Sequence, residues 1–230
     1  MQSKTMPDAR LMSALPFLTR GGRCIDVGTD HAYLPIYLVA GGICREALAC
    51  DINEGPLASA REHILEAGLA DRIGTCLTDG LHGLCDYSPD DIMIFGMGGE
   101  LIVRILQEAP WVKDRGIGLI LQPMSRASVL RQYLTQNGFA ILDEALSKSG
   151  RIYQTIHARY CGKNETYTEE ELLLGRQNIL NPTPLFCEFV RHELSVCQKV
   201  IRGKERSESA DCRDERRMER ILTERLEKLQ

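Results

Sequence analysis

The sequence predicts an α/β protein whose mostly parallel sheet carries helices on both faces, followed by a helical appendage. Five apolar strand-like runs alternate with helical segments, which is typical of a parallel sheet. Two more apolar segments, separated by the turn-forming residues 148–151, close the series as an antiparallel pair. Beyond about residue 163 charges become dense and strand-like runs stop. We therefore expect two domains, residues 1–162 and 163–230.

The composition limits the kinds of protein that this chain can be. Its 230 residues suffice for one α/β domain and a smaller appendage. No apolar run is long enough to span a bilayer, and the N-terminus lacks the layout of a signal peptide, so we expect a cytoplasmic protein with no membrane partner. The nine cysteines are scattered singly without C-x-x-C spacing, which favours reduced thiols and no metal site. A net charge of −4 gives no general sign of nucleic-acid binding, although a local basic face is all that such binding needs.

The elements of the first domain follow from apolar spacing and from the residues that start and stop helices. Asp8 can cap a first helix in which Leu11, Leu15 and Leu18 recur at helical spacing, and Gly21-Gly22 would end it. The expected parallel strands are residues 23–27, 46–50, 73–77, 91–95 and 118–122, and the antiparallel pair is residues 139–147 and 152–160. The expected connecting helices are residues 33–40, 54–67, 100–108 and 127–136.

The second domain reads as two helical stretches, residues 169–200 with an interruption at 181–184, and residues 210–229. Apolar residues recur at helical spacing in both stretches, so we expect an antiparallel hairpin of coiled-coil type. It is either a solvated appendage or an arm that contacts a macromolecular substrate.

The stretch from Asp26 to Pro35 lies where the first strand turns into the first connecting helix, an edge at which nucleotides and related cofactors bind. A dinucleotide site needs G-x-G-x-x-G, but only Gly28 is present, and the carboxylate of Asp30 would repel a pyrophosphate. These residues disfavour NAD and FAD. They favour a cofactor with a cationic sulfonium and no phosphate.

Acidic residues also follow the next two strands. Asp51 can accept hydrogen bonds from two ribose hydroxyls, and Asp79 can accept from an adenine amino group. An aspartate at a strand end forms a turn or caps a helix as often as it binds a ligand, so the three acids together are stronger evidence than any one of them. Together these residues predict a cradle for S-adenosylmethionine. The predicted contacts there are Asp26, Gly28, Asp51, Ile52 and Asp79.

The fourth strand ends in Gly96-Met97-Gly98-Gly99, where a methyl acceptor must approach the donor. Glycines let the backbone come close to a flat ring, so we count Gly96, Met97 and Gly98 among the cofactor-site residues. An equally good interpretation is a helix N-terminus packed tightly on the sheet.

Five strings, in this order and spacing, resemble the TrmK family of bacterial tRNA methyltransferases: DVGTDHAYLP, CDIN-GP, TDGL, FGMGGELI and LILQP, within residues 11–160. The resemblance implies S-adenosylmethionine-dependent methylation of N1 of an adenine, at position 22 of tRNA. It implies a class I, Rossmann-like methyltransferase fold with a seven-stranded sheet and a C-terminal coiled-coil domain. It also implies cofactor contacts at Asp26, Gly28, Asp51, Asp79 and Gly80.

Two positions depart from the family pattern. Family members often have a Gly-Glu pair where this chain has Cys50-Asp51, which keeps the carboxylate. They often have Asn where this chain has Met124, which leaves open whether position 124 contacts the acceptor.

Methylation of adenine N1 needs alignment and no prior deprotonation, because N1 has a free lone pair. Asp30 could accept a hydrogen bond from the exocyclic amine and stabilise the cationic product, or it could simply cap the following helix. Tyr33 could stack on the base or serve as a core or lid residue, and His31 could line the wall of the site. The candidate phosphate contacts, if not merely solvated, are Arg10, Arg126, Arg131 and Arg151.

Other functions remain open at this point. A methyltransferase for a small molecule or a protein would share the cradle, and a non-catalytic module would use the same fold for docking alone. The sequence does not decide the oligomeric state, for which we expect a monomer or a weak dimer.

Overall fold

The structure, a computed structural model, describes residues 8–113, 116–206 and 211–229. The chain divides into two compact units, one ending at Thr166 and the other beginning at Tyr167. Within the described residues every strand belongs to the first unit, and the second unit is helical.

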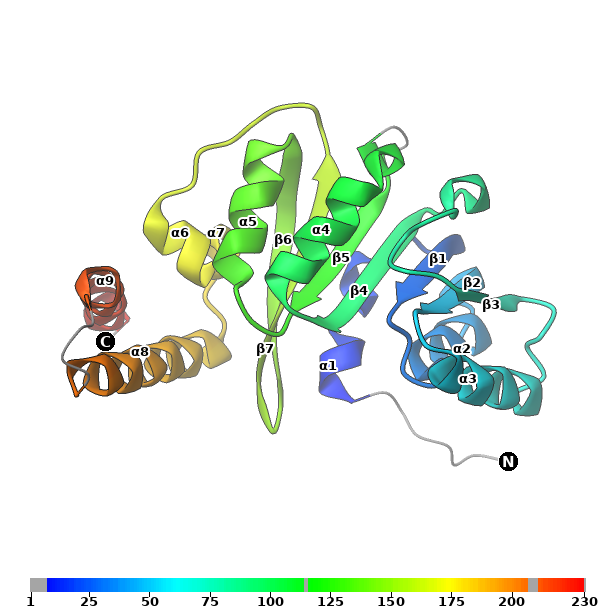
Figure 1. Ribbon diagram of the computed structural model, residues 1–230, viewed down its shortest axis with the longest axis horizontal. Helices are drawn as coiled ribbons and strands as arrows, with labels where there is room; N and C mark the ends of the chain where they lie inside the picture. The colour runs from blue at the N-terminus through cyan, green and yellow to red at the C-terminus, as the bar shows by residue number, and fades with distance from the viewer. Residues whose placement is uncertain (1–7, 114–115, 207–210, 230) are drawn as a thin grey trace. The chain divides into compact units, whose positions relative to one another are not determined.

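A seven-stranded sheet forms the centre of the first unit, in the order β3-β2-β1-β4-β5-β7-β6 (Figure 1). Strands β1 to β5 pair in parallel, whereas β7 runs antiparallel to both β5 and β6. This confirms the predicted parallel sheet with a terminal antiparallel pair. The strands are Gly22–Val27 (β1), Cys44–Asp51 (β2), Ile73–Leu77 (β3), Asp91–Met97 (β4), Gly118–Pro123 (β5), Phe139–Ser149 (β6) and Arg151–Tyr160 (β7).

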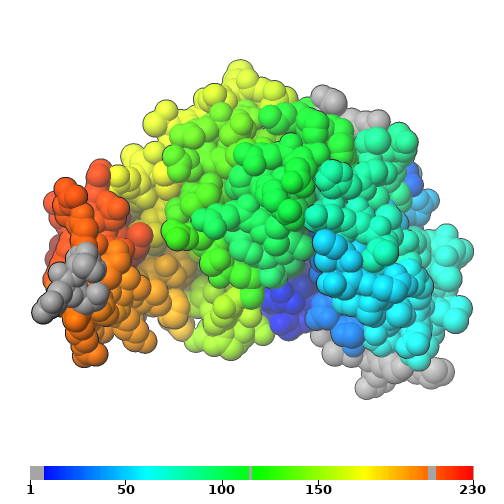
Figure 2. Space-filling model, in the orientation of Figure 1, coloured from blue at the N-terminus to red at the C-terminus, as the bar shows by residue number. Residues whose placement is uncertain are grey.

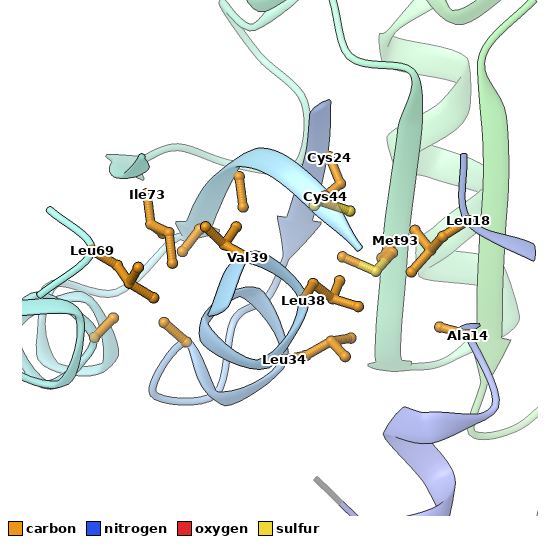
Figure 3. Close-up of a cluster of buried hydrophobic side chains, with 14 of the residues drawn as sticks. Ala14, Leu18, Cys24, Leu34, Leu38, Val39, Cys44, Leu69, Ile73 and Met93 are labelled. Carbon is orange, nitrogen blue, oxygen red and sulfur yellow. The ribbon is translucent and has the colours of Figure 1, made fainter. Parts of the chain in front are cut away.

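Helices cover both faces of this sheet. On one face Leu34 and Leu38 of α2 point toward Met93 of β4 in a buried apolar cluster (Figure 3). Side chains alternate along a strand, so Ile92 and Ile94 point to the opposite face, on which α4 and α5 lie (Figure 1). Four helices connect the strands: α2 (Tyr33–Ala40), α3 (Glu54–Glu66), α4 (Gly99–Glu108) and α5 (Ala127–Gln136).

The first helix is shorter than its apolar spacing predicts. Asp8 caps it as expected, since its Oδ1 accepts a hydrogen bond from the Leu11 N–H at 3.0 Å. The α-helix α1 nevertheless covers only Ala9–Met12, and a separate 3₁₀ turn, η1, covers Leu15–Phe17. Pro16 lacks an N–H group and disfavours helical geometry at the residue before it, which explains the break. Two further 3₁₀ turns are η2 (Cys85–Tyr87) and η3 (Pro110–Lys113).

The second unit begins with two short helices, α6 (Glu169–Leu174) and α7 (Arg176–Leu180). Thr168 and Glu171 form a reciprocal capping box at the start of α6. The predicted interruption at residues 181–184 is confirmed, but a second break at Gly175 was not predicted. Gly175 has φ +88°, a conformation that ends a helix and that glycine adopts readily.

The long helices α8 (Pro184–Glu205) and α9 (Arg213–Lys228) pack against each other. Gln198 hydrogen-bonds Glu219 and Lys204 hydrogen-bonds Glu215, so the partners run in opposite directions along the two helices. The predicted helical hairpin is therefore present, while its coiled-coil character stays a prediction. Among the described helices, none is both long and apolar enough to cross a membrane.

Candidate active site

The predicted site residues gather at one edge of the sheet, because the carboxyl ends of β1 to β5 all meet there. Asp26 lies in β1, Asp51 ends β2 and Met97 ends β4. Asp79 and Gly80 come shortly after the end of β3. The strand order β3-β2-β1-β4 places these four contributions side by side.

The turn after β1 comes very close to the end of β4. Gly28 has φ +75°, and a Cβ added to it would lie 2.5 Å from Cε of Met97. The N–H groups of Gly28 and Thr29 both donate to the Cys50 carbonyl, at 2.8 and 2.9 Å, which ties the turn to β2. The positive φ favours a glycine here, and any larger residue would also displace the end of the Met97 side chain.

Asp26 is a buried carboxylic acid below this turn. Burial raises the pKa of its side chain to about 6, and the Thr29 hydroxyl and the Arg10 guanidinium partly offset that rise. The charged form of Asp26 is therefore costly when no ligand is bound. A cationic group bound next to it would offset that cost.

This raised pKa predicts how stability depends on pH. In the unfolded chain Asp26 loses its proton near pH 4, whereas in the folded protein it holds the proton up to about pH 6. The contribution of Asp26 should thus lower the free energy of unfolding as pH rises from about 4 to about 6, by on the order of 2–3 kcal/mol. Urea denaturation of the wild type and Asp26→Asn across this range measures it. Equal pH slopes in the two proteins would show that Asp26 does not titrate as described.

Asp30 and the two residues after it lead into α2 without capping it. The N-cap of α2 is Ala32, and it receives no side-chain hydrogen bond, so the capping role considered for Asp30 is wrong. The Asp30 side chain is 74% exposed, and its Oδ1 lies 3.2 Å from Nε2 of His31. His31 and Ala32 both have positive φ, 58° and 57°, which is unusual for residues other than glycine.

Three aromatic rings, including that of His31 next to Asp30, cluster together. The Tyr33 ring stacks on His63 of α3 with centroids 5.2 Å apart, and His31 lies 5.6 Å from Tyr33 and 5.7 Å from His63. Nδ1 of His63 also lies 3.1 Å from the His31 carbonyl oxygen. Tyr33 is 36% exposed, so it is a surface ring supported from behind and does not belong to the core.

The ends of β2 and β3 supply carboxylates and exposed apolar side chains. Oδ1 of Asp51 accepts the Asn53 N–H at 2.7 Å, and Oδ1 of Asp79 accepts from Arg104 of α4 at 3.2 Å. Next to these acids, Ile52 and Leu77 are 61% and 56% exposed. Gly80 has φ +60°, and a Cβ added to it would lie 3.0 Å from Ile105, so a glycine here lets the turn pack closely against α4.

The glycines that follow Phe95 were predicted either to let a ligand approach the backbone or to pack a helix start on the sheet, and the structure shows features of both. Gly99 packs against the backbone of Ser125 and Arg126, which is the tightly packed helix start. Gly96 is exposed with φ +79°, and it interrupts the ladder, since Phe95 pairs with Gln122 whereas Met97 pairs with Pro123. Gly96 thus forms a β-bulge at the edge where an acceptor would approach. Gly98 lies between them, against Oγ of Ser125.

One of the four candidate phosphate contacts is wrong. Arg131 is fully buried, where its Nε donates to Glu144 Oε1 at 2.7 Å. Arg126 is exposed and lies 3.8 Å from Glu100. Arg10 and Arg151 lie on α1 and at the start of β7.

Sequence reasoning missed two features of the site. His63 supports Tyr33 although the two residues are thirty positions apart. Gln122 of β5 is fully buried, and its Nε2 lies within hydrogen-bond distance of the Arg10 carbonyl (3.0 Å), Ser13 Oγ (3.2 Å) and Thr155 Oγ1 (2.9 Å). Contacts between distant elements leave no local pattern in a sequence.

These residues fit a nucleoside cofactor that carries a positive charge. Asp51 with its exposed neighbour Ile52 offers acceptors for a ribose beside an apolar surface for a ring. Gly28 is half-buried and Gly96 is exposed, so both leave backbone accessible where the chain that carries the sulfonium would pass. Among the described residues no group of three or more His, Cys, Asp or Glu side chains is arranged to hold a metal ion.

Comparison with known proteins identifies the family of the chain. The methyltransferase domain family matches residues 8–156. The tRNA (adenine(22)-N(1))-methyltransferase of Bacillus subtilis is 31% identical over 228 residues, which cover 96% of this chain and 94% of that protein.

Two solved structures are similar over nearly the whole chain. The crystal structure of the B. subtilis m1A22 tRNA methyltransferase TrmK superposes with a TM-score of 0.76 at 29% identity, covering 95% of this chain and 94% of that one. A Streptococcus pneumoniae protein, described as a candidate tRNA (m1A22) methyltransferase and solved with S-adenosyl-L-methionine, gives a TM-score of 0.84 at 28% identity. It covers 96% of this chain and 100% of that one. The chain therefore belongs to the TrmK family of tRNA (adenine-22-N1)-methyltransferases.

Proposed function

We propose that this protein transfers a methyl group from S-adenosylmethionine to N1 of an adenine in tRNA, at the position 22 named for its B. subtilis relative. The observation that carries the proposal is the juxtaposition of an exposed carboxylate, Asp30, and an exposed ring, Tyr33, directly after the cofactor turn at Gly28. We also propose that it acts in the cytoplasm, as a monomer or a weak dimer.

The cofactor would be held along the ends of four strands. Asp51 would accept from the ribose hydroxyls, Ile52 would contact the adenine ring, and Asp79 with Gly80 would line its far side. Asp26 and Gly28, with Gly96, Met97 and Gly98, would surround the methionine part. When bound, S-adenosylmethionine supplies a methyl group on a sulfonium, which needs no activation by the protein.

The remaining work of the protein concerns the adenine. N1 lies on the Watson–Crick edge, so the base must leave its stack before it can reach the site. Tyr33, supported by His63, offers the base a flat surface. Asp30 would accept a hydrogen bond from the exocyclic amine, which holds N1 in line and stabilises the positive charge that develops on the ring. His31 orients the Asp30 carboxylate through the contact between its Nε2 and Oδ1.

The assignment of Asp51 can be tested by binding. Asp51→Ala should raise the dissociation constant of S-adenosylmethionine about 10- to 100-fold, since two hydrogen bonds to a charged group are removed. Isothermal titration calorimetry measures this. Asp71→Ala is the matched control, because Asp71 is exposed just before β3, at the opposite edge of the sheet. An unchanged dissociation constant in Asp51→Ala would remove Asp51 from the cofactor site.

The activity is tested by incubating tRNA with the protein and S-adenosylmethionine, and analysing the nucleosides by mass spectrometry. The expected product is 1-methyladenosine. In parallel, labelled cofactor is incubated with metabolite pools and with protein extracts. Label in either of these, with none in tRNA, would replace the proposal with a small-molecule or protein methyltransferase, and no transfer to any acceptor would favour a docking module.

A further inference from the structure

Two arginines and a tyrosine form a basic aromatic cluster beside the site: Arg151 and Tyr153 lie at the start of β7, and Arg10 comes from α1. The guanidinium carbon of Arg151 lies 4.8 Å from the centroid of the Tyr153 ring, and that of Arg10 lies 5.8 Å from the same ring. Nη2 of Arg151 also lies 2.8 Å from Sδ of Met124. We name Arg10, Met124, Arg151 and Tyr153 the Tyr153 cluster.

The cluster adjoins the end of the sheet where the acceptor would enter. Nη1 of Arg10 lies 3.7 Å from the position that a Cβ on Gly96 would occupy. Met124 follows the last residue of β5, and its N–H donates to the Met97 carbonyl at 2.8 Å. The cluster therefore lies on the β4–β5 side of the site, away from the acids that follow β2 and β3.

Its place is fixed by one partly buried and one exposed hydrogen bond. The amide of Gln122 holds the Arg10 carbonyl, and Oγ of Ser149 donates to Asp8 at 3.2 Å, so α1 is attached to both β5 and the hairpin. In Figure 2, α1 in dark blue reaches the surface between the hairpin in yellow-green and the lighter blue residues of the first half of the chain.

Arg151 carries the least compensated charge of the cluster. Arg10 has Asp8 at 3.9 Å and also interacts electrostatically with the buried Asp26, whereas Arg151 has no carboxylate within ion-pair distance among the residues that the structure describes. A guanidinium against an aromatic face keeps the N–H groups at its edge available and is held in one orientation. This combination of fixed cations and a ring recognises the phosphate and sugar of an unpaired nucleotide.

We propose that the Tyr153 cluster binds the phosphodiester backbone next to the target adenosine, with Arg151 as a phosphate contact that sets affinity for tRNA. The inference rests on the proposed tRNA methylation and names a surface for that substrate outside the reacting groups. Arg151 touches no reacting atom, so it governs binding of tRNA and not the transfer itself.

The test compares Arg151→Met, which retains an apolar side chain against Tyr153 but removes the charge, with the wild type. The KM for tRNA should rise about tenfold because a charge-assisted hydrogen bond is removed, while kcat and the dissociation constant of S-adenosylmethionine stay the same. The slope of log affinity against log salt should decrease by about one, as expected when the protein neutralises one phosphate fewer. Arg151→Lys should show an intermediate KM, since it keeps the charge without the planar fork.

Arg45→Ala is the control, because Arg45 is exposed near the start of β2 at the opposite edge of the sheet. It should change none of these quantities. An Arg151→Met protein with the KM and salt slope of the wild type would overturn the inference while the proposed function stands. If the wild type does not methylate tRNA, the proposed function fails, and fluorescence anisotropy with labelled tRNA then decides the inference by the same comparison of affinity and salt slope.

Discussion

Replacing Asp30 with alanine should lower kcat for tRNA methylation about 100-fold, the size expected when one preorganised electrostatic interaction with the developing charge is removed. Binding of S-adenosylmethionine should remain, because the Asp30 side chain is exposed, does not cap α2 and pairs with the neighbouring His31. Single-turnover kinetics with saturating tRNA and calorimetry with the cofactor measure the two quantities separately.

Asp30→Asn is the matched variant, since it keeps the shape of the side chain and removes its charge. If charge stabilisation dominates, Asn should be almost as slow as Ala. If the main role is to accept the amine hydrogen bond, Asn should recover much of the rate. Loss of cofactor binding in either variant, at unchanged kcat, would instead place Asp30 in the cofactor cradle.

The second large effect concerns stability. Glu144→Ala should lower the free energy of unfolding by about 3–5 kcal/mol, because it leaves the guanidinium of Arg131 buried without its carboxylate. Arg131 also donates to Oε1 of Gln154 at 2.7 Å. In the variant this neutral partner would still accept a hydrogen bond but would not balance the positive charge. Urea denaturation monitored by circular dichroism measures the decrease.

The double variant Arg131→Met with Glu144→Leu separates the cost of an unpaired charge from the cost of poorer packing. It should recover most of the stability, since apolar residues of similar volume often replace a buried ion pair without loss. Glu62→Ala, on the exposed side of α3, is the neutral control. A Glu144→Ala protein as stable as this control would show that Arg131 moves to solvent when its partner is removed.

The sequence allowed the sheet to be predicted because strands buried on both faces are continuous apolar runs. The run from Asp91 to Phe95 is such a strand, and its parallel neighbours are found in the same way. Helix ends were less certain. The breaks at Pro16 and Gly175 depend on single residues within segments whose apolar residues otherwise recur at helical spacing. The prediction followed that spacing and therefore continued the helices through both residues.

The candidate site was predictable to the extent that parallel topology brings strand ends together. That rule placed Asp26, Asp51 and Asp79 at one edge. It says nothing of residues that arrive from elsewhere, such as His63 and Tyr153. The prediction of Arg131 as a phosphate contact was wrong, although its position in the sequence already indicated burial.

Arg131 falls at helical spacing with Ala127, Leu130 and Leu134, all on the buried face of α5. A charged residue on that stripe predicts a buried partner, not a phosphate contact.

Because of the bulge at Gly96, the geometry of the site depends on the number of residues at the end of β4. One residue more is present in β4 than in the facing part of β5, so Gly96 is left outside the ladder. Removing that residue would restore a regular ladder, and Gly99 would be drawn about 3.3 Å along the strand, away from its packing against Ser125 and Arg126. The number of residues between Phe95 and Gly99 therefore matters more for the structure than the identity of their side chains. A single deletion there would disturb the cofactor side and the acceptor side of the site at once.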